Sequence, residues 1–303
     1  MASIDYVNVF QQIFANSSPN NKIKYSDLIE DPRLSSVKVG TRKKNLKNYI
    51  DRNPQVLFSL AGLIPSPETV ISLVEAELGP VTDDNIVVAN ARCAEIIGDI
   101  TKPMVLSFVS QQLAQNIDNQ TKNIHIPVDE LIAFLLGDFS DYIRASGNGL
   151  MSIAGSLNEK LLHRVLESSG LIKGQGFSVT GTDSQADILI HTAGANNLGV
   201  EVKSYHARER LLRGLQDVQE PKVGVGYFKD AAEFNYARTI TLLQANPAAI
   251  YMPSATLANV DELSRTVTVN VRVAFGSRLY RPLERFGADM FYFSQNGNLP
   301  EFQ

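Results

Sequence analysis

Two short apolar runs with alternating side chains lie close together in the second half of the chain, and they constrain its fold more than any other feature. They are Ala186-Asp187-Ile188-Leu189-Ile190-His191 and Leu198-Gly199-Val200-Glu201-Val202-Lys203-Ser204-Tyr205. A period of two predicts β-strands, and the short glycine-containing loop between the runs predicts a hairpin. A hairpin centred on Gly194 pairs Ile188 with Val200 and Ile190 with Leu198, which gives it one continuous apolar face.

The same pairing places Asp187, Glu201 and Lys203 together on the opposite face of the hairpin. Directly opposed Cβ atoms in such a pair lie about 4.5–5.5 Å apart. Two carboxylates at that distance repel each other unless a cation lies between them, and hard oxygen ligands favour Mg²⁺ together with waters and phosphate oxygens. Lys203 could hold or deprotonate the attacking water, or stabilise charge developing on phosphorus. The set therefore suits metal-assisted hydrolysis of a phosphodiester.

Other interpretations of these residues stay open. Glu201 and Lys203 could form an ordinary ion pair on a solvent-facing hairpin. A second acid-x-lysine run, Glu220-Pro221-Lys222, is set aside because a proline interrupts it and no strand headed by an acid precedes it. His206 follows the motif, but we favour a surface residue over a general base, and its spacing to Asp187 does not indicate a catalytic triad.

The elements around the hairpin alternate between helix and strand. A helix over about 156–169 ends at Gly170, and further strands and helices are expected at 177–179, 207–219, 223–228, 230–245, 248–252 and 266–275. Strands interleaved with helices predict an α/β domain built on a mixed β-sheet that helices flank on both faces.

The first half of the chain is different in pattern. Apolar residues recur at helical spacing over 68–78, 84–97, 103–117 and 128–143, and prolines mark the ends of these segments. Clear strand alternation is absent before residue 175. The run Ser146-Gly147-Asn148-Gly149 then breaks the pattern. We therefore expect a mainly helical N-terminal region, 1–147, followed by an α/β domain, 148–303.

With these elements placed, the chain resembles the PD-(D/E)XK nuclease superfamily, and most of all its type II restriction endonucleases. The resemblance covers about residues 150–255 and rests on Asp187, a 13-residue gap and Glu201-Val202-Lys203. A helix carrying Glu159 precedes the motif, and an arginine-rich helix follows it. Ala186 stands where the family often has proline.

The resemblance implies a restriction-endonuclease-like core and a role for each matched residue. Asp187, Glu201 and the Val202 carbonyl would hold Mg²⁺, and Lys203 would be the catalytic lysine. Glu159 would be an accessory acid. A local explanation of Glu159 is equally available, because Ser156 and Glu159 have the spacing of a helix capping box. Glu167 is a weaker substitute for it.

Basic residues gather at three places where DNA could bind. Lys38, Arg42, Lys43, Lys44, Lys47 and Arg52, offset by Asp51 alone, carry a charge of 6 − 1 = +5 on or beside a predicted helix, Thr41–Ile50. This helix follows a helical stretch near Tyr25–Ile29, an order typical of a helix-turn-helix. The second set is Arg208, Arg210 and Arg213, and the third, more diffuse set is Arg272, Arg278, Arg281 and Arg285. Exposed, solvated helix faces are the alternative interpretation of the first two sets.

Composition limits the class of protein. The chain has 28 Lys and Arg against 32 Asp and Glu, a net charge of −4, so a nucleic-acid site must be a local patch. The apolar run 131–136 is far too short to cross a bilayer, and the N-terminus lacks the pattern of a signal peptide. The single cysteine, Cys93, suits a reducing compartment. We expect a cytoplasmic protein with no membrane partner.

These observations predict a type II restriction endonuclease that uses Mg²⁺ to cleave double-stranded DNA at a specific sequence. Cutting both strands of a symmetric site favours a homodimer, and a companion DNA methyltransferase could act on the same site. Two alternatives stay open: a repair or recombination nuclease of the same superfamily that is structure-directed or non-specific, and a non-enzymatic DNA-binding regulator.

Overall fold

The computed structural model describes most of the chain. The described residues are 4–17, 23–53, 56, 59–61, 66–118, 120–121, 123–136, 155–180, 186–194, 196–203, 208–219 and 221–303. They fall into two compact units: the first comprises Met1–Val74 and Arg92–Ile153, and the second Glu75–Ala91 and Ala154–Gln303. The expected boundary at 147/148 lies outside the described residues.

A six-stranded sheet forms the centre of the second unit. Its strands are β3 (Phe177–Val179), β4 (Ile188–Ile190), β5 (Leu198–Lys203), β6 (Lys222–Gly226), β7 (Ala249–Met252) and β8 (Tyr280–Pro282), in that spatial order. β3, β4 and β5 pair antiparallel, and β5 through β8 pair parallel. The predicted mixed sheet is confirmed, and so is the hairpin register, since Ile188 pairs with Val200 and Ile190 with Leu198.

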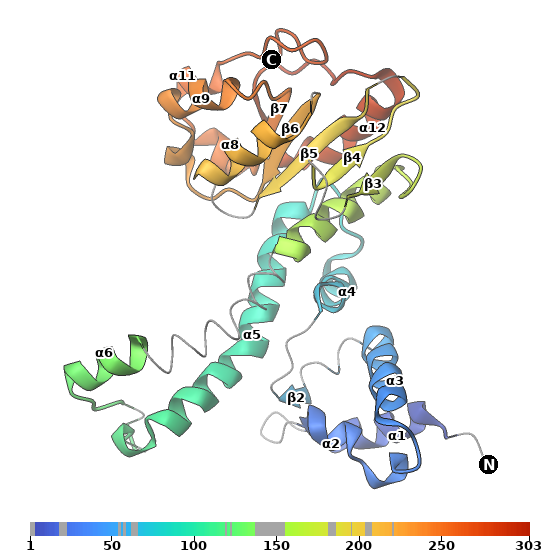
Figure 1. Cartoon of the computed structure of the whole chain (residues 1–303), viewed down its shortest axis with the longest axis vertical. Helices are drawn as coiled ribbons and strands as arrows, with labels where there is room; N and C mark the ends of the chain where they lie inside the picture. The colour runs from blue at the N-terminus through green and yellow to red at the C-terminus, as the bar shows by residue number, and fades with distance from the viewer. Residues whose placement is uncertain are drawn as a thin grey trace. The chain divides into compact units, whose positions relative to one another are not determined.

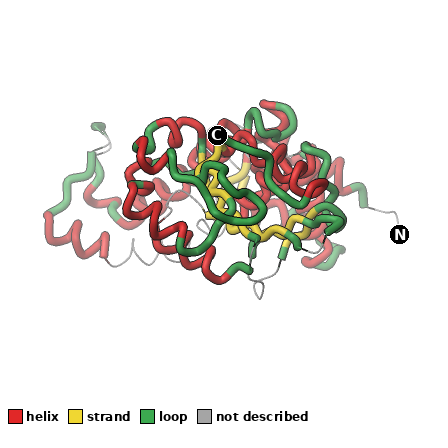
Figure 2. Tube along the Cα trace, turned by 90° about the horizontal axis from the view of Figure 1, so that it is seen from above, coloured by secondary structure: helices red, strands yellow, loops and turns green. Residues whose placement is uncertain are grey.

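Helices cover both faces of this sheet. They are helix 155–168, α8 (Arg208–Asp217), α9 (Tyr236–Leu243), α10 (Ser254–Ala258), α11 (Glu262–Arg265) and α12 (Phe286–Asn296), with 3₁₀ turns η4 (Ala231–Phe234) and η5 (Leu283–Arg285). Figure 1 shows α8 and α12 on opposite faces of the sheet. α8 packs on β5 and β6, whereas side chains of α12 contact Tyr251 of β7. Figure 2 shows the yellow strands running between red helices. The predicted fold class is therefore confirmed.

The segment Glu75–Ala91 belongs to the second unit because polar side chains join it to that unit. Asp83 accepts hydrogen bonds of 2.8 Å from the amides of Gly287 and Ala288 at the start of α12. The buried Asn90 donates to Asn158 at 2.7 Å. The sequence pattern did not anticipate this, because the partners lie far away along the chain.

The first unit is mainly helical, as predicted. It contains α1 (Tyr6–Ala15), α2 (Tyr25–Ile29), η1 (Pro32–Leu34), α3 (Val39–Arg52), η3 (Ala114–Asn116) and α6 (Val128–Leu136), and two-residue strands β1 (Ile23–Lys24) and β2 (Leu60–Ala61). The division between units falls within α4 (Pro67–Leu78) and α5 (Ile86–Gln112). Tyr49 of α3 packs against Phe10 and Phe14 of α1, with ring centroids 5.4 and 5.8 Å apart.

Three expectations about these elements are wrong. α5 continues through Pro103, where a stop was expected; a proline inside a helix removes one hydrogen bond but need not end it. The parallel pair β1–β2 was missed, because two-residue strands are too short to show alternation. The stretch 266–275 is not a strand. It folds back on itself, with Thr268 bridging Arg278, and β8 follows instead.

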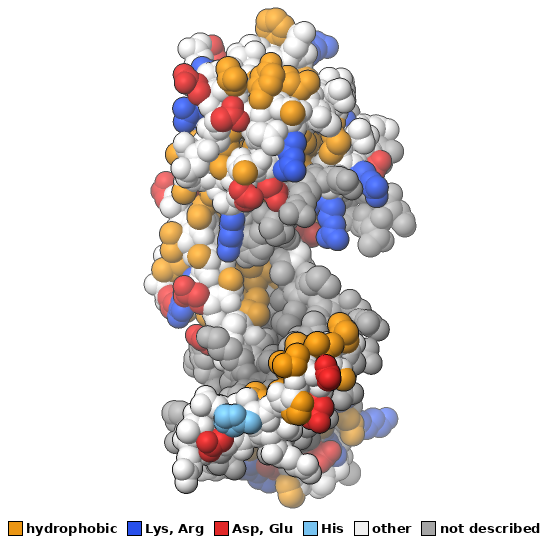
Figure 3. Space-filling view, turned by 90° about the vertical axis from the view of Figure 1, so that its left-hand side faces the viewer, with side chains coloured by type: hydrophobic (Ala, Val, Ile, Leu, Met, Phe, Trp, Pro, Cys, Tyr) orange, Lys and Arg blue, Asp and Glu red, His pale blue; other side chains and the backbone are white. Residues whose placement is uncertain are grey.

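α6 carries much of the exposed apolar surface of the first unit. Val128 is 70% exposed and Leu136 is 77% exposed, while Phe134 is buried. Figure 3, which views the side of the molecule that carries α6, shows apolar side chains beside acidic ones. The predicted continuation of this helix to 143 lies outside the described residues. Among the described residues, no helix has the length and apolar character needed to span a membrane.

Candidate active site

Asp187 lies at the open end of the β4–β5 hairpin, where backbone hydrogen bonds hold it in place. The Asp187 amide donates to the carbonyl of Val200 at 3.1 Å, which continues the ladder one residue before β4 begins. The carboxylate of Asp187 reaches along β5, and its Oδ2 accepts a 2.7 Å hydrogen bond from the amide of Val202. The register therefore sets the position of this side chain through the backbone.

Lys203 brings the three predicted charged side chains together. Its Nζ forms an ion pair with Oε1 of Glu201 and lies 4.0 Å from Oδ2 of Asp187. Glu201 is only 7% exposed. The interpretation of the hairpin as an ordinary solvent-facing ion pair is therefore wrong: the acid of this pair is buried in the unit.

α8 is the element that buries Glu201. Gly214 of α8 faces the Glu201 side chain so closely that a Cβ at position 214 would lie 2.7 Å from Glu201 Cγ. Sequence reasoning missed this contact. A signal was present, because a glycine in the interior of a predicted amphipathic helix weakens that helix and so calls for a packing reason.

Burial and mutual repulsion disfavour the charged form of Glu201. Loss of solvent raises the pKa of the Glu201 carboxyl, the bond from Lys203 opposes this, and repulsion from Asp187 adds to the rise. Asp217 of α8 contributes in the same direction. The site thus carries more negative charge than Lys203 alone compensates.

Glu159 lies within electrostatic reach of this group. Burial is the largest cause that raises the pKa of Glu159. Repulsion from Asp187 raises this pKa further, and Lys203 opposes the rise. Ser156 lies inside helix 155–168 rather than just before it, which differs from the geometry of a capping box. Glu159 interacts electrostatically with Asp187, Lys203 and Glu201, and a local helix cap does not explain this interaction.

The donor chemistry of the site fits a divalent cation such as Mg²⁺. Asp187 and Glu201 present hard oxygens that are near one ammonium group, and Mg²⁺ is typically bound through one or two carboxylates with water and phosphate oxygens supplying the rest. Among the described residues, no group of three or more His, Cys, Asp or Glu side chains is arranged to hold a metal. Glu159 therefore does not complete a three-carboxylate ligand set.

The basic helix after β5 is α8. Arg210 and Arg213 are exposed on it, whereas the Arg208 side chain lies outside the described residues. His206 and Glu220 also lie outside them. Lys222, from the discarded acid-x-lysine run, is buried and donates to the carbonyl of Val218 at 2.9 Å, which is a structural contact.

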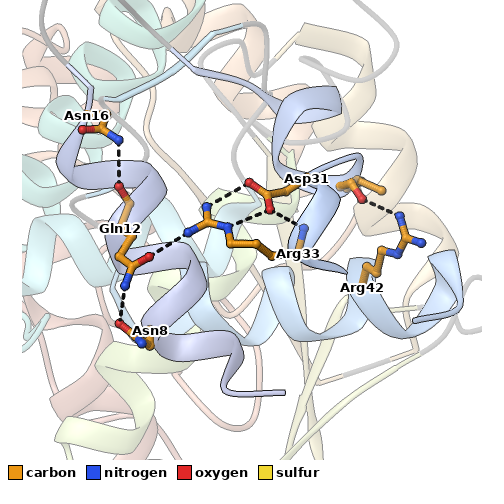
Figure 4. A network of polar contacts seen from close by, with 7 residues as sticks. Asn8, Gln12, Asn16, Asp31, Arg33 and Arg42 are labelled. Atoms are coloured by element: carbon orange, nitrogen blue, oxygen red, sulfur yellow. Dashed lines mark hydrogen bonds and ion pairs between the residues drawn. The ribbon is translucent and has the colours of Figure 1, made fainter. Parts of the chain in front are cut away.

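The basic cluster of the first unit divides into two kinds of residue. Arg42 donates to three backbone carbonyls, those of Val37 at 2.6 Å, Ile29 at 2.9 Å and Ser35 at 2.9 Å. Figure 4 shows Arg42 beside the Arg33–Asp31 ion pair. Arg42 therefore holds the connection between α2 and α3, a role that sequence reasoning did not assign to it.

The lysines of α3 differ from Arg42. Lys43, Lys44 and Lys47 are exposed, and the buried side of the helix is formed by Leu46, Tyr49 and Ile50. α2 precedes α3 as expected, but η1 lies between them, so the connection is longer than the turn of about 3–4 residues in a helix-turn-helix.

The third basic set is in part internal. Arg281 has no exposed surface and forms a 2.8 Å ion pair with the buried Asp289, so its interpretation as a DNA contact is wrong. Its guanidinium also donates to the carbonyl of Pro300, which ties the C-terminal segment to the sheet.

Comparison with known proteins gives few matches. The chain matches no family model and no curated protein sequence. A solved structure that it resembles is restriction endonuclease PspGI in complex with substrate DNA, with a TM-score of 0.49 and 12% identity. The match covers 76% of this chain and 93% of that chain. The case for a function therefore rests on the side chains of the site itself.

Proposed function

We propose that this protein is a Mg²⁺-dependent endodeoxyribonuclease. The observation that carries the proposal is the convergence of Lys203 with Asp187 and Glu201, in which a half-buried ammonium group pairs with the buried Glu201 carboxylate and lies 4.0 Å from that of Asp187. Burying the Glu201 carboxylate beside a second carboxylate is costly for folding, so such a cluster favours a functional role over a structural one.

Each residue has a role in the hydrolysis. Asp187 and Glu201 would hold the ion, with the Val202 carbonyl as a further ligand. When bound, Mg²⁺ would neutralise charge on the phosphate and make a bound water more acidic. Lys203 would orient the attacking water and stabilise the charge that develops on phosphorus. Water oxygen bonds to phosphorus, the bond from phosphorus to one nucleotide oxygen breaks, and that oxygen takes up a proton. Glu159 would be an accessory acid.

The substrate we propose is double-stranded DNA cut at a specific sequence, as a type II restriction endonuclease acting in the cytoplasm would do. Arg210 and Arg213, with Arg208, would contact phosphates beside the site, and Lys43, Lys44 and Lys47 would add contacts from α3. Two active sites are needed to cut both strands of a symmetric sequence, so we propose a homodimer. Such an enzyme can have a companion DNA methyltransferase acting on the same sequence.

One assay tests this proposal against its alternatives. Purified protein is incubated with phage DNA in Mg²⁺ or in EDTA, and the products are separated on a gel. Discrete bands that require Mg²⁺ support the restriction endonuclease, and a metal-dependent smear supports a non-specific or structure-directed nuclease. DNA that is retarded but intact in Mg²⁺ and in Mn²⁺ contradicts the nuclease and supports the DNA-binding regulator.

A further inference from the structure

α8 lies very close to the sheet because glycines take the place of side chains where the two meet. A Cβ at Gly199 of β5 would collide with the side chain of Val218, which directly follows α8. A Cβ at Gly224 of β6 would lie 3.0 Å from Leu211 Cδ1 and 3.6 Å from Leu215 Cδ1. Gly199 and Gly224 on the strands therefore allow the short distance between α8 and the sheet.

Gly214 is the corresponding glycine on the helix side, and it faces the active site. A Cβ on residue 214 would meet Oε1 and Cδ of Glu201, and it would lie 2.7 Å from Cγ. Real Cβ atoms do not approach other atoms so closely, so a larger residue would require a shift. The backbone of Glu201 is held in β5 between β4 and β6, so its side chain must move or α8 must lift.

Such a shift would change the ion pair between Glu201 and Lys203. Oε1 is the atom nearest the virtual Cβ, and it is also the atom paired with Lys203 Nζ. Alanine is a better helix former than glycine in a helix interior, so helix stability does not explain a glycine at position 214. We propose that Gly214 is a positioning residue, which leaves room for the Glu201 carboxylate to stay against Lys203. This inference rests on the proposed function for its catalytic consequence.

The first test is a size exchange between residues 214 and 201, read out as DNA cleavage in Mg²⁺. Gly214→Ala should lower cleavage at least about 100-fold, because a misplacement of about 1 Å can cost that much. Glu201→Asp shortens the acid by one methylene, so Glu201→Asp combined with Gly214→Ala should cut at least about tenfold faster than Gly214→Ala alone. Gly98→Ala in α5, where a Cβ meets nothing within 4 Å, is the matched control and should cut like wild type.

The second test needs no activity. Gly214→Ala should lower the Tm of the full chain by at least about 3 °C when Glu201 is present. In a Glu201→Ala background the clash is gone, so the same substitution should leave the Tm unchanged or raise it. A non-additive result of this kind locates the effect in the contact between the two residues.

Two results would overturn the inference. One is cleavage by Gly214→Ala within about threefold of wild type. The other is an equal loss of Tm in both backgrounds, which would place the effect elsewhere in α8. If wild-type protein cuts no DNA in Mg²⁺ or Mn²⁺, the proposed function fails by itself, and the Tm measurements still decide whether Gly214 positions Glu201.

Discussion

Two regions of this protein carry charged residues to which the sequence assigns a function, and the structure treats them differently. The β4–β5 hairpin carries Asp187, Glu201 and Lys203 on otherwise apolar strands, whereas α3 carries a run of basic residues. At the hairpin, Glu201 is 7% exposed and is paired with Lys203. On α3, Lys43, Lys44 and Lys47 are exposed to solvent.

Comparing buried with exposed charged residues shows which of them indicate a function. A charged group loses much of its favourable interaction with water when it is buried, so a buried cluster indicates that the charges themselves are needed. An exposed lysine has no such cost, so its presence says little about function. Arg42 and Arg281 show a third case, in which a cation that sequence alone could assign to DNA is used by the scaffold.

The largest effect is expected from removing the ammonium group that pairs with the buried Glu201. Lys203→Ala should lower DNA cleavage by about 100- to 1,000-fold, because a positioned charge aimed at the reacting phosphate stabilises the transition state strongly. DNA binding, measured by gel retardation, should be largely unchanged. Undiminished cleavage would remove Lys203 from the mechanism.

A matched variant separates this effect from a general loss of positive charge. Lys173 is exposed and lies just before the turn at 174–176 of the same unit. Lys173→Ala should cut DNA like wild type. Circular dichroism at the assay temperature checks that both variants are folded, since Lys203→Ala leaves two carboxylates without their shared cation.

The α/β half of the chain was predictable because its signals are local. Period-two alternation located β3, β4 and β5, and the loop length set the register that pairs Ile188 with Val200. That register is why Asp187, Glu201 and Lys203 could be placed together from sequence. The same rule failed at 266–275, where alternating residues form turns. Phe275 there is 74% exposed, so alternation alone did not imply burial on a sheet.

The contacts that sequence could not supply are those made at long range. Gly214 meets Glu201 only because α8 docks on β5, and Asp83 meets α12 across much of the chain. Arg42 was interpreted by its charge alone, whereas its geometry matches three backbone carbonyls. Donor geometry of this kind depends on the path of the backbone, which composition and periodicity do not encode.

The next largest effect is expected at α3, where Arg42 binds backbone carbonyls and the lysines are exposed. Arg42→Ala should destabilise the first unit by about 2 kcal/mol, because it removes three charge-assisted bonds to backbone carbonyls, two of them part-buried. Lys43→Ala combined with Lys44→Ala should change stability by less than about 0.5 kcal/mol. It should instead weaken DNA binding and reduce the slope of log affinity against log salt by up to about 2.

Urea unfolding and DNA binding at several salt concentrations measure these two effects. An unchanged salt slope in the double-lysine variant would return Lys43 and Lys44 to an ordinary solvated helix face. An unchanged stability in Arg42→Ala would mean that the carbonyl contacts of Arg42 do not hold α2 to α3.

The smallest effect is expected at Glu159, and it depends on pH. The folded-state pKa of Glu159 is raised above 4.5 by burial and by Asp187. Between 4.5 and this raised pKa the native state binds more protons than the unfolded state, so the stability of wild type falls as pH rises through that range. Glu159→Gln should therefore match wild type below pH 4.5 and have a Tm about 1–2 °C higher at pH 8.

Cleavage by the same variant decides what the carboxylate is for. An accessory acid predicts that Glu159→Gln gains stability at pH 8 while it loses cleavage, because the charge that is costly for folding is the one used at the site. Glu301→Gln, at an exposed C-terminal position, should change neither quantity. A Tm that falls at both pH values would show that Glu159 stabilises the fold, and unchanged cleavage would leave Asp187, Glu201 and Lys203 to act without it.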